Sequence, residues 1–352
     1  MAILNKIYPL LLAVLLTGCY EPFTPDIDTK PVLCLSSLIT AGEPIEVTVT
    51  HTWLYTDEAA TLNHEVDDAV VSVYANGEEV GEDYIPQEKD RIRIVAESKT
   101  YGSAEAEVTV PESVPIDAVE WDAVVTDIWR SDDPTLWTYS AGEGDAGSRD
   151  YILKLMTVDL DFRASVVIKD PAETVNYYEF FYSSFPKEED TDSDVTVVAP
   201  LSFSPGTFHD WDEPIFSEHL GSFEIMTGNS SYGFTFFSDR QFSGKDYALK
   251  VLFTDARCRI RGEDLSEVPE DFGYELTLAT VSPSYYNWSS YRWNAEEGTL
   301  NDLIDVGLSD PTWGYSNVST GAGVVAARSL YTFKVSLRDF LQRALSVKKS
   351  ED

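Results

Sequence analysis

Apolar and polar side chains alternate along residues 45–55. The apolar or ring-bearing ones stand at every second position, at Ile45, Val47, Val49, His51, Trp53 and Tyr55. A period of two residues places alternate side chains on opposite faces of an extended strand. The pattern therefore predicts a strand over residues 45–55 with one buried face.

A hairpin is expected shortly after this strand. Val71 and Val73 precede the dipeptide Asn76-Gly77. Both positions of such a dipeptide accept a positive φ, which a two-residue hairpin turn requires. The dipeptide therefore predicts a tight turn between two antiparallel strands.

The alternation returns in two further segments, residues 91–96 and residues 104–110, and the second segment ends at Pro111. Several short strands with polar opposite faces indicate two packed antiparallel sheets. We therefore expect an all-β chain whose first domain, residues 31–112, is a β-sandwich of the immunoglobulin or fibronectin type.

Strand-like segments are more widely spaced beyond Pro111. They cover residues 151–162, 163–168, 176–182, 233–237, 246–253 and 274–281. Residues 284–293 are the best helical stretch, with Tyr285, Trp288 and Trp293 on one face, and residues 338–349 suit a short terminal helix. We expect a larger β-rich domain over residues 113–352 with long loops and a short helix.

Long polar insertions separate these strands, at residues 127–149, 183–200 and 205–231. Long loops on a rigid scaffold are either binding elements or variable decoration. Aromatic side chains ringed by polar groups are good anchors in a protein interface. The insertions hold four candidate residues for contact with a partner or cargo, namely Trp129, Trp137, Phe208 and Trp211. The alternatives are that these aromatics belong to the core and that docking uses the first sandwich or the segment around Gly321.

The first nineteen residues have the pattern of a bacterial lipoprotein signal. Lys6 precedes an apolar stretch, which closes on Leu16-Thr17-Gly18-Cys19. The stretch is too short to span about 30 Å of hydrocarbon, but it has the length of a signal-peptide core. We expect residues 1–18 to be removed and Cys19 to carry the lipid. Residues 19–30, with their prolines and acids, then form an extended tether.

Composition narrows the class of protein. The formal net charge of −36 repels phosphate groups, so no binding to nucleic acid is expected. Strong acidity commonly serves solubility, although an acidic surface also suits cationic or metal-bearing cargo. Hydrophobic and aromatic fractions of 43% and 12% exclude a disordered chain.

Two cysteines remain after Cys19. Cys34 lies in an apolar, strand-like run, where a cysteine usually acts as a small buried side chain. Cys258 lies between Arg257 and Arg259, and neighbouring cations would lower the pKa of its thiol. Whether Cys34 and Cys258 form a disulfide is left open, because the sequence does not show whether they are close.

No motif in the sequence predicts catalysis. The four histidines lack the spacing of a metal-binding motif, and residues 209–213 fit an acidic loop better than a metal site. Asp190, Asp192 and Asp194 resemble the start of a calcium loop, but that loop's glycine and its terminal glutamate are missing. We therefore expect no enzyme activity, no cofactor and no bound metal.

A family resemblance covers nearly the whole chain after the signal. Together with the lipobox, four segments carry it: residues 35–45, residues 170–178, residues 237–245 and residues 315–324. Their order and spacing resemble the Bacteroidetes lipoproteins grouped as DUF4249, a domain of unknown function. Gly321 and Gly323 in the last segment suit a turn or a close backbone approach between strands.

The resemblance implies an accessory role at the outer membrane, because members of the family look like partners of TonB-dependent transporters. We expect a lipid-anchored outer-membrane lipoprotein, exposed at the cell surface or on the periplasmic face. It would dock on a transporter-type barrel and help to capture or gate cargo. The alternative is a structural subunit of an outer-membrane complex that binds no small molecule.

Overall fold

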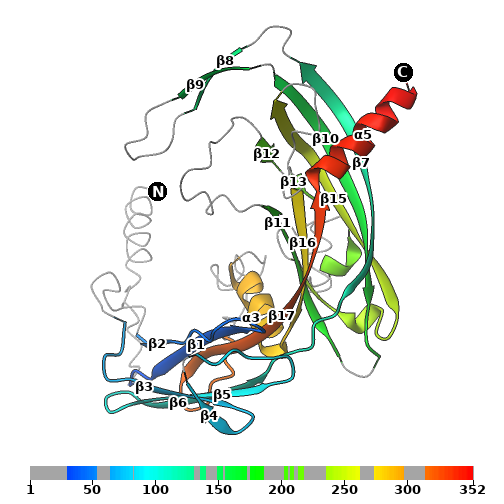
Figure 1. Ribbon diagram of the computed structural model, residues 1–352. Helices are drawn as coiled ribbons and strands as arrows, with labels where there is room; N and C mark the ends of the chain where they lie inside the picture. The colour runs from blue at the N-terminus through cyan, green and yellow to red at the C-terminus, as the bar shows by residue number, and fades with distance from the viewer. Residues whose placement is uncertain are drawn as a thin grey trace, which may run out of the picture. The chain divides into compact units, whose positions relative to one another are not determined.

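The computed structural model describes residues 30–53, 64–81, 83–130, 135–139, 149–153, 155–172, 175–185, 202–204, 207–209, 213–217, 235–261, 273–296 and 314–351. The predicted signal peptide, Cys19 and nearly all of the tether lie outside the described residues. Residues 32–352 form one compact unit. Strands make up most of this unit (Figure 1), which confirms the prediction of an all-β chain.

A four-stranded antiparallel sheet, in the order β4-β3-β5-β6, forms one layer of the first sandwich. Its strands are β3 (Val70–Ala75), β4 (Glu78–Val80), β5 (Arg91–Ser98) and β6 (Gly102–Thr109). Asn76 and Gly77 join β3 to β4 with φ angles of 53° and 91°. The predicted hairpin is confirmed, and both turn residues have the positive φ that it requires.

Burial along β5 and β6 follows the alternation of the sequence. On β5, Ile92, Ile94 and Ala96 are buried, whereas Arg91 is exposed and Arg93 is half-buried. Ala104, Ala106 and Val108 of β6 are buried on the same side of the sheet. The predicted faces of these two strands are therefore confirmed.

A six-stranded sheet, in the order β14-β11-β16-β17-β1-β2, is the largest in the described chain. Its strands are β1 (Leu33–Thr40), β2 (Thr48–His51), β11 (Tyr177–Phe185), β14 (Phe236–Ser238), β16 (Gly273–Val281) and β17 (Ala322–Ser336). The strand nearest the C-terminus, β17, runs parallel to β1 and antiparallel to β16. The first and the last strand of the described chain are thus hydrogen-bonded neighbours.

The pairing of β17 changes partner at Arg328. This residue lies opposite Thr40 of β1 and also opposite Val281 of β16. On the β1 side, side chains built on Gly321 or Gly323 would collide with the β1 backbone. The close backbone approach that the sequence predicts at these two glycines is therefore confirmed.

A five-stranded sheet has the order β12-β15-β10-β7, with β13 also paired to β15. Its strands are β7 (Ile116–Arg130), β10 (Leu155–Lys169), β12 (Ser202–Ser204), β13 (Thr207–Phe208) and β15 (Asp246–Arg261). A separate hairpin pairs β8 (Thr135–Tyr139) with β9 (Arg149–Leu153).

Two hydrophobic cores lie in the unit. The first packs the four-stranded sheet against β1 and the start of β17, with Leu33, Leu35 and Val325 among its buried residues. This core confirms the predicted sandwich. One of its strands comes from beyond residue 320, so the sandwich includes chain from both sides of the boundary expected at residue 112.

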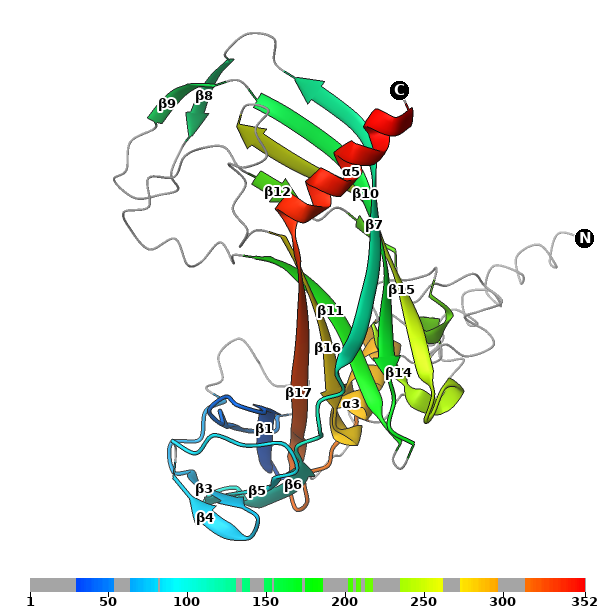
Figure 2. The ribbon, with the colours of Figure 1, turned by 45° about the vertical axis from the view of Figure 1, so that its right-hand side comes forward.

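The second core packs β11 and β16 against the five-stranded sheet. Helix α5 (Leu337–Glu351) contacts β7 and closes one side of this core (Figure 2). Its residues Phe340 and Leu341 are fully buried. The predicted helix over residues 338–349 is confirmed, and it is part of the core.

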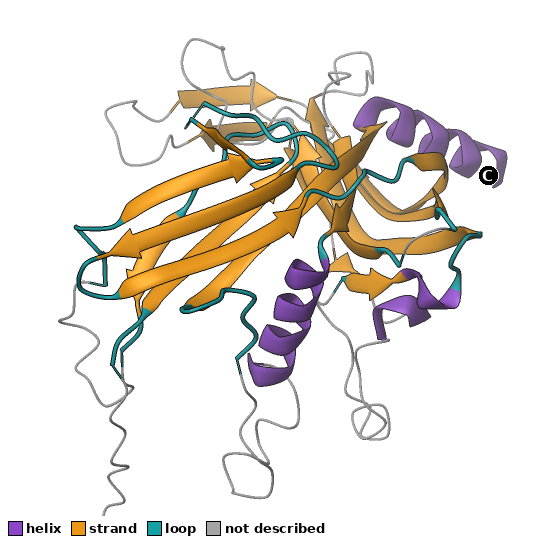
Figure 3. Cartoon of the chain, turned by 90° about the horizontal axis from the view of Figure 1, so that it is seen from below, coloured by secondary structure: helices purple, strands orange, loops and turns teal. Residues whose placement is uncertain are grey.

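Helix α3 (Pro283–Glu296) confirms the helix predicted over residues 284–293. Two 3-10 helices, η3 (Pro214–Ser217) and η4 (Asp239–Gln241), are short connections. Figure 3 shows the helices beside the strands, which form the bulk of the described chain.

Some predicted elements differ from the structure. The strand expected over residues 45–55 is shorter, because only β2, Thr48–His51, pairs with β1. The Glu46 carbonyl instead accepts a hydrogen bond of 2.8 Å from the Ser37 hydroxyl. The insertion expected over residues 127–149 also contains strand, namely the end of β7, all of β8 and the start of β9.

Candidate functional site

Helix α3 packs beside β17 (Figure 1). Residues of α3 and the face of β1 and β17 that points away from the first core line a pocket of about 500 Å³. We call it the α3 pocket. It is lined by Ser36, Ser37, Leu38, Glu46, Thr48, Tyr285, Trp288, Tyr315, Gly323, Val324 and Ala326.

The floor of the α3 pocket follows from the alternation of side chains along β1. Leu35 and Ile39 point into the first core, whereas Ser36 and Leu38 point the other way. Ser36 lies opposite Val324 of β17, and Leu38 lies opposite Ala326. Leu38 remains 39% exposed, which is unusual for a leucine in a central strand. The floor is therefore largely apolar, with the Ser36 hydroxyl beside Leu38, Val324 and Ala326, and it is open to a ligand.

Two aromatic residues of α3 form one wall. Tyr285 and Trp288 are three positions apart, so they share a face of the helix. Their ring centroids are 6.1 Å apart and their planes differ by 15°. The two rings therefore present nearly parallel surfaces beside the apolar floor.

The start of α3 is fixed to β17 by hydrogen bonds. The Ser282 hydroxyl accepts a bond of 3.0 Å from the Ala327 N–H and one of 3.4 Å from the Tyr285 N–H. The Ser284 hydroxyl donates to the Val325 carbonyl at 3.0 Å. Pro283, which has no N–H to satisfy, begins the helix. These contacts hold the aromatic wall at a fixed place over the sheet.

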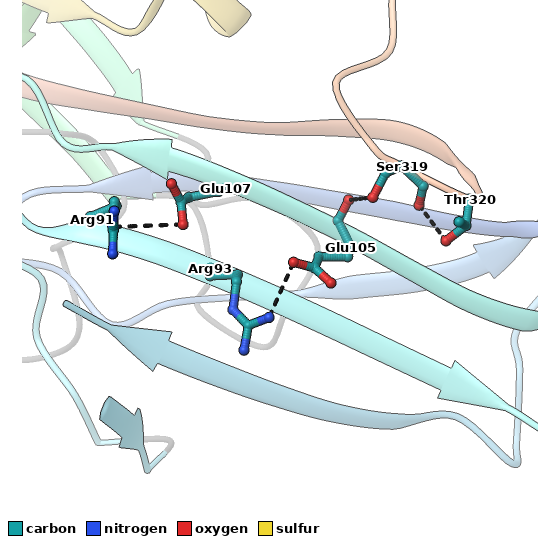
Figure 4. A network of polar contacts seen from close by, with 6 residues as sticks. All are labelled: Arg91, Arg93, Glu105, Glu107, Ser319 and Thr320. Atoms are coloured by element: carbon teal, nitrogen blue, oxygen red, sulfur yellow. Dashed lines mark hydrogen bonds and ion pairs between the residues drawn. The ribbon is translucent and has the colours of Figure 1, made fainter. Parts of the chain in front are cut away.

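Tyr315, the third aromatic residue, belongs to a segment that is tied down on both sides of the sheet. The Asn317 side chain donates to the Val325 carbonyl at 2.8 Å and accepts from the Val325 N–H at 2.9 Å. Ser319 and Glu105 exchange two backbone hydrogen bonds of 2.7 and 3.2 Å. The Ser319 hydroxyl also donates to the Glu105 carbonyl at 3.0 Å (Figure 4). The segment that contains Tyr315 is thus hydrogen-bonded to β17 of the six-stranded sheet and to β6 of the four-stranded sheet.

Charged groups stand beside the aromatic wall. The Arg292 guanidinium lies 5.6 Å from the centre of the Trp288 ring. Burial raises the pKa of Tyr285, and the nearby positive charge of Arg328 opposes that rise. At the rim, the exposed Glu46 provides the single formal charge among the lining residues.

Glu179 of β11 lies close to Arg328 and Tyr285, behind the wall. Its Oε2 atom is buried without a hydrogen-bond partner. Burial raises the pKa of Glu179 to about 7, and the positive charge of Arg328 opposes that rise. The region behind the α3 pocket therefore contains a carboxyl group that titrates near neutral pH.

A second pocket, of about 680 Å³, lies between α5 and strands β7 and β10. Trp121, Glu120, Asp122, Arg163 and Arg343 are among its lining residues. The Arg343 guanidinium lies 4.8 Å from the centre of the Trp121 ring, the one aromatic ring in that lining. The α3 pocket, with three aromatic side chains, is the better candidate for a ligand site.

Of the four residues that the sequence suggested for partner or cargo contact, the three that the structure describes are not in the lining of the α3 pocket. Trp129 is in β7 and 53% exposed. Phe208 is in strand β13 and half-buried, with its ring 5.2 Å from that of Phe253 and 5.4 Å from that of Tyr182. Trp137 is in β8, and Trp211 lies outside the described residues. Phe208 therefore packs on the second core, whereas Trp129 is at the surface.

The sequence placed Tyr285 and Trp288 on one face of a helix and included Tyr315 in a family segment, but gave none of them a role. Their spacing is the signal that identifies the wall. The residues of β1 that form part of the floor lie about 250 residues before α3 in the chain. The parallel pairing of β1 with β17 brings them to the pocket.

Both cysteines of the described chain are free. The expectation of a lowered thiol pKa at Cys258 is wrong. Arg257 is exposed, whereas Cys258 points into the core and is fully buried, because neighbours in a strand face opposite ways. Burial raises the pKa of Cys258 to about 12 and also raises that of Cys34.

Of residues 209–213, the described His209 and Glu213 contribute hydrogen bonds to the fold. His209 is 2.7 Å from the Thr254 hydroxyl, and Glu213 accepts from the Lys250 N–H at 2.7 Å and from the Tyr247 hydroxyl. Within the described ranges, no group of three or more histidine, cysteine or acidic side chains is arranged to hold a metal ion. Nor does that part of the chain contain a helix of the length and apolarity needed to cross a membrane.

Comparison with known proteins identifies the family to which this chain belongs. A search of curated proteins found no match, and neither did a search of solved structures. The model of one protein family, described as a domain of unknown function, matches residues 20–332 and so covers the first core, most of the second core and the lining of the α3 pocket. The resemblance seen in the four sequence segments is confirmed: the chain belongs to the DUF4249 family.

Proposed function

We propose that this protein is a lipid-anchored outer-membrane lipoprotein of Bacteroidetes that docks on a TonB-dependent transporter-type barrel and captures cargo in the α3 pocket. The observation that carries the cargo-binding role is the pocket itself. It combines three aromatic side chains, an apolar floor and a few polar groups, as small-molecule sites commonly do.

The pocket suits binding more than chemical conversion. Ser282 and Asn317 fix its walls to the backbone of β17, so a ligand meets a preformed surface. A preformed site spends less binding energy on ordering its own side chains. Capture of cargo, rather than catalysis, is the role that this rigidity supports.

The lipobox supports the location. Acyl chains on Cys19 would hold the mature protein on a membrane, and two or more chains hold much more firmly than one. The prolines and acids between Cys19 and Lys30 suit an extended spacer between the lipid and the folded unit. A site on the cell surface, beside a transporter barrel, is consistent with this arrangement.

A second candidate is a structural subunit that contacts the barrel without binding cargo. Two apolar side chains on β7 favour this candidate, because Trp129 is 53% exposed and Val124 is 41% exposed. Large apolar side chains at a surface are common anchors of protein interfaces.

One pair of measurements tests the proposal. The tagged wild type and a Cys19→Ser variant are expressed in the native organism, and mass spectrometry is applied to the mature N-terminus. An acylated Cys19 in the wild type and an unacylated variant are expected. An unmodified residue 19 in the wild type would refute the lipid anchor.

Co-purification from solubilised outer membrane tests docking. The wild type should recover a barrel protein, and Trp129→Ala should reduce that recovery if β7 is the contact surface. Trp288→Ala should leave it unchanged, because the α3 pocket serves cargo in this proposal. Recovery of no membrane protein by the folded, lipidated wild type would refute the accessory role.

A further inference from the structure

We propose that the α3 pocket binds a neutral sugar ring. This inference rests on the proposed function, in which the pocket holds cargo, and it adds the chemical class of that cargo. Three properties of the lining carry it: the aromatic wall, the balance of charge around the wall, and the polar groups at the rim.

The aromatic wall provides surface for a flat, partly apolar ring. Tyr285 and Trp288 lie within 15° of parallel, and Tyr315 adds a third ring from another segment. Leu38 and Val324 extend the apolar surface below them. One face of a pyranose ring consists largely of C–H groups, which pack on such surfaces.

Charge around the wall disfavours a cation. The Arg292 guanidinium lies 5.6 Å from the centre of the Trp288 ring, and the positive charge of Arg328 lies close enough to Tyr285 to oppose the rise of its pKa. The wall therefore already interacts with two positive groups. The negative field of the chain attracts a cationic ligand at a distance, but on the same rings that ligand would be repelled by both arginines at close range.

Charge at the rim disfavours an anion. The pocket lining has one formal charge, the exposed carboxylate of Glu46, and the chain as a whole has a net charge of −36. An anionic ligand would meet a like charge at the entrance and a negative field during its approach. A neutral ligand avoids both costs.

The rim also disfavours a purely apolar ligand. Ser36, Thr48 and Glu46 line the pocket together with the apolar floor. An apolar ligand would remove these groups from water without giving them hydrogen-bond partners, and each such loss costs about 1–3 kcal/mol. Sugar hydroxyls can donate to the Glu46 carboxylate and exchange bonds with the two hydroxyl side chains. The volume of about 500 Å³ is within the usual range for small-ligand sites.

Binding of neutral disaccharides to the purified full chain tests this inference. The protein is kept in a detergent without a sugar head group, because a glycoside detergent would compete for the pocket. Maltose, cellobiose, lactose, mannobiose, xylobiose and chitobiose are titrated by calorimetry, with phenethylamine and benzoate as the cationic and anionic probes.

At least one disaccharide should bind, and the two charged probes should not. Trp288→Ala should weaken that binding at least tenfold, whereas Trp288→Phe, which keeps a ring, should retain most of it. Glu46→Gln should weaken it severalfold, because the amide is a poorer acceptor for sugar hydroxyls. Trp53→Ala removes another exposed tryptophan, far along the chain from α3, and should have no effect.

Three results would overturn the inference: no disaccharide binds the folded wild type, Trp288→Ala leaves binding unchanged, or phenethylamine binds where the sugars do not. A thermal melt of each variant shows that it is folded. Recovery of a barrel in the co-purification is independent of all three results. The sugar inference can therefore fail while the proposed accessory function holds. A disaccharide can also bind while no barrel is recovered, and the two experiments distinguish these cases.

Discussion

The carbonyl oxygen of Leu35 occupies the space that a side chain on Gly323 would need. Gly323 also has a φ of +110°, a conformation that residues with a Cβ rarely adopt. The parallel pairing of β1 with β17, on which both the first core and the floor of the α3 pocket depend, therefore requires glycine at this position.

Gly323→Ala should destabilise the protein by at least about 2 kcal/mol, because the new methyl group meets backbone and the φ is unfavourable. Urea unfolding, followed by tryptophan fluorescence, measures the change in free energy. Gly81→Ala is the matched control, since no atom lies within 4 Å of its added Cβ, and it should be nearly neutral. Equal stability of the two variants would contradict the close approach.

Glu179 should make stability fall as pH rises from about 4.5 to about 7. The folded state holds a proton on Glu179 up to about pH 7, whereas the unfolded state loses it near pH 4.5. In that window the folded state binds more protons, so stability falls with rising pH and levels off above the window. This difference in the pKa of Glu179 between the folded and unfolded states lowers the free energy of unfolding by at most about 3 kcal/mol across the window.

Glu179→Gln cannot ionise, so it should lack this fall and exceed the wild type in stability at pH 8. Unfolding in urea at pH 5, 6, 7 and 8 measures the difference. Glu97→Gln, at an exposed position, should follow the wild-type curve at every pH. Parallel curves for wild type and Glu179→Gln would show that Glu179 does not titrate in this range.

Cys258 should resist alkylation in the native protein. Its thiol is fully buried, and burial raises its pKa to about 12, so almost no reactive thiolate is present at pH 8. Iodoacetamide at pH 8, followed by peptide mass spectrometry, should label Cys258 only after denaturation. Rapid labelling of Cys258 in the native protein would contradict its place in the core.

Phe340→Ala should cost about 3–5 kcal/mol, as large-to-small changes of buried aromatic residues do. The Phe340 ring lies 5.3 Å from that of Phe162 and 5.9 Å from that of Trp121, so it joins α5 to the second core. Thermal or urea unfolding measures the loss. Gln342→Ala, on the exposed side of α5, is the control and should cost less than about 0.5 kcal/mol.

Local patterns predicted the elements that have one face in the core and one in solvent. Ile92 and Ile94 alternate with arginines, and the strand that contains them is found as expected. Asn76-Gly77 forms the expected turn, because the requirement for positive φ is local. In each case the sequence pattern that predicts the element lies within a few residues, and the prediction does not depend on contacts with distant parts of the chain.

The sequence did not predict β17 and β7, because neither strand has a regular alternation of apolar and polar side chains. β17 contains Val324, Val325, Ala326 and Ala327 in succession, without alternation. One of its faces contacts the first core and the other lines the α3 pocket, so both faces are apolar and the period of two is lost. β7 has its register against β10 shifted at two places, which breaks its pattern.

The candidate site was predictable only in part. The shared face of Tyr285 and Trp288 follows from helical spacing. The partnership of Leu38 with Ala326 depends on a parallel pairing between segments almost 290 residues apart, and parallel pairs follow from the whole topology. The core position of Phe208 was missed because β13 is two residues long and has no pattern of its own.

The pairing of β1 with β17 sets an order of events during synthesis. The chain is synthesised from its N-terminus, so Leu33–Thr40 is made long before Ala322–Ser336. The first core stays open on one side until β17 has been made, and contacts of such high sequence separation form slowly. Nascent chains cut short before residue 322 should therefore be sensitive to protease throughout residues 33–109, although every residue of the four-stranded sheet is already present.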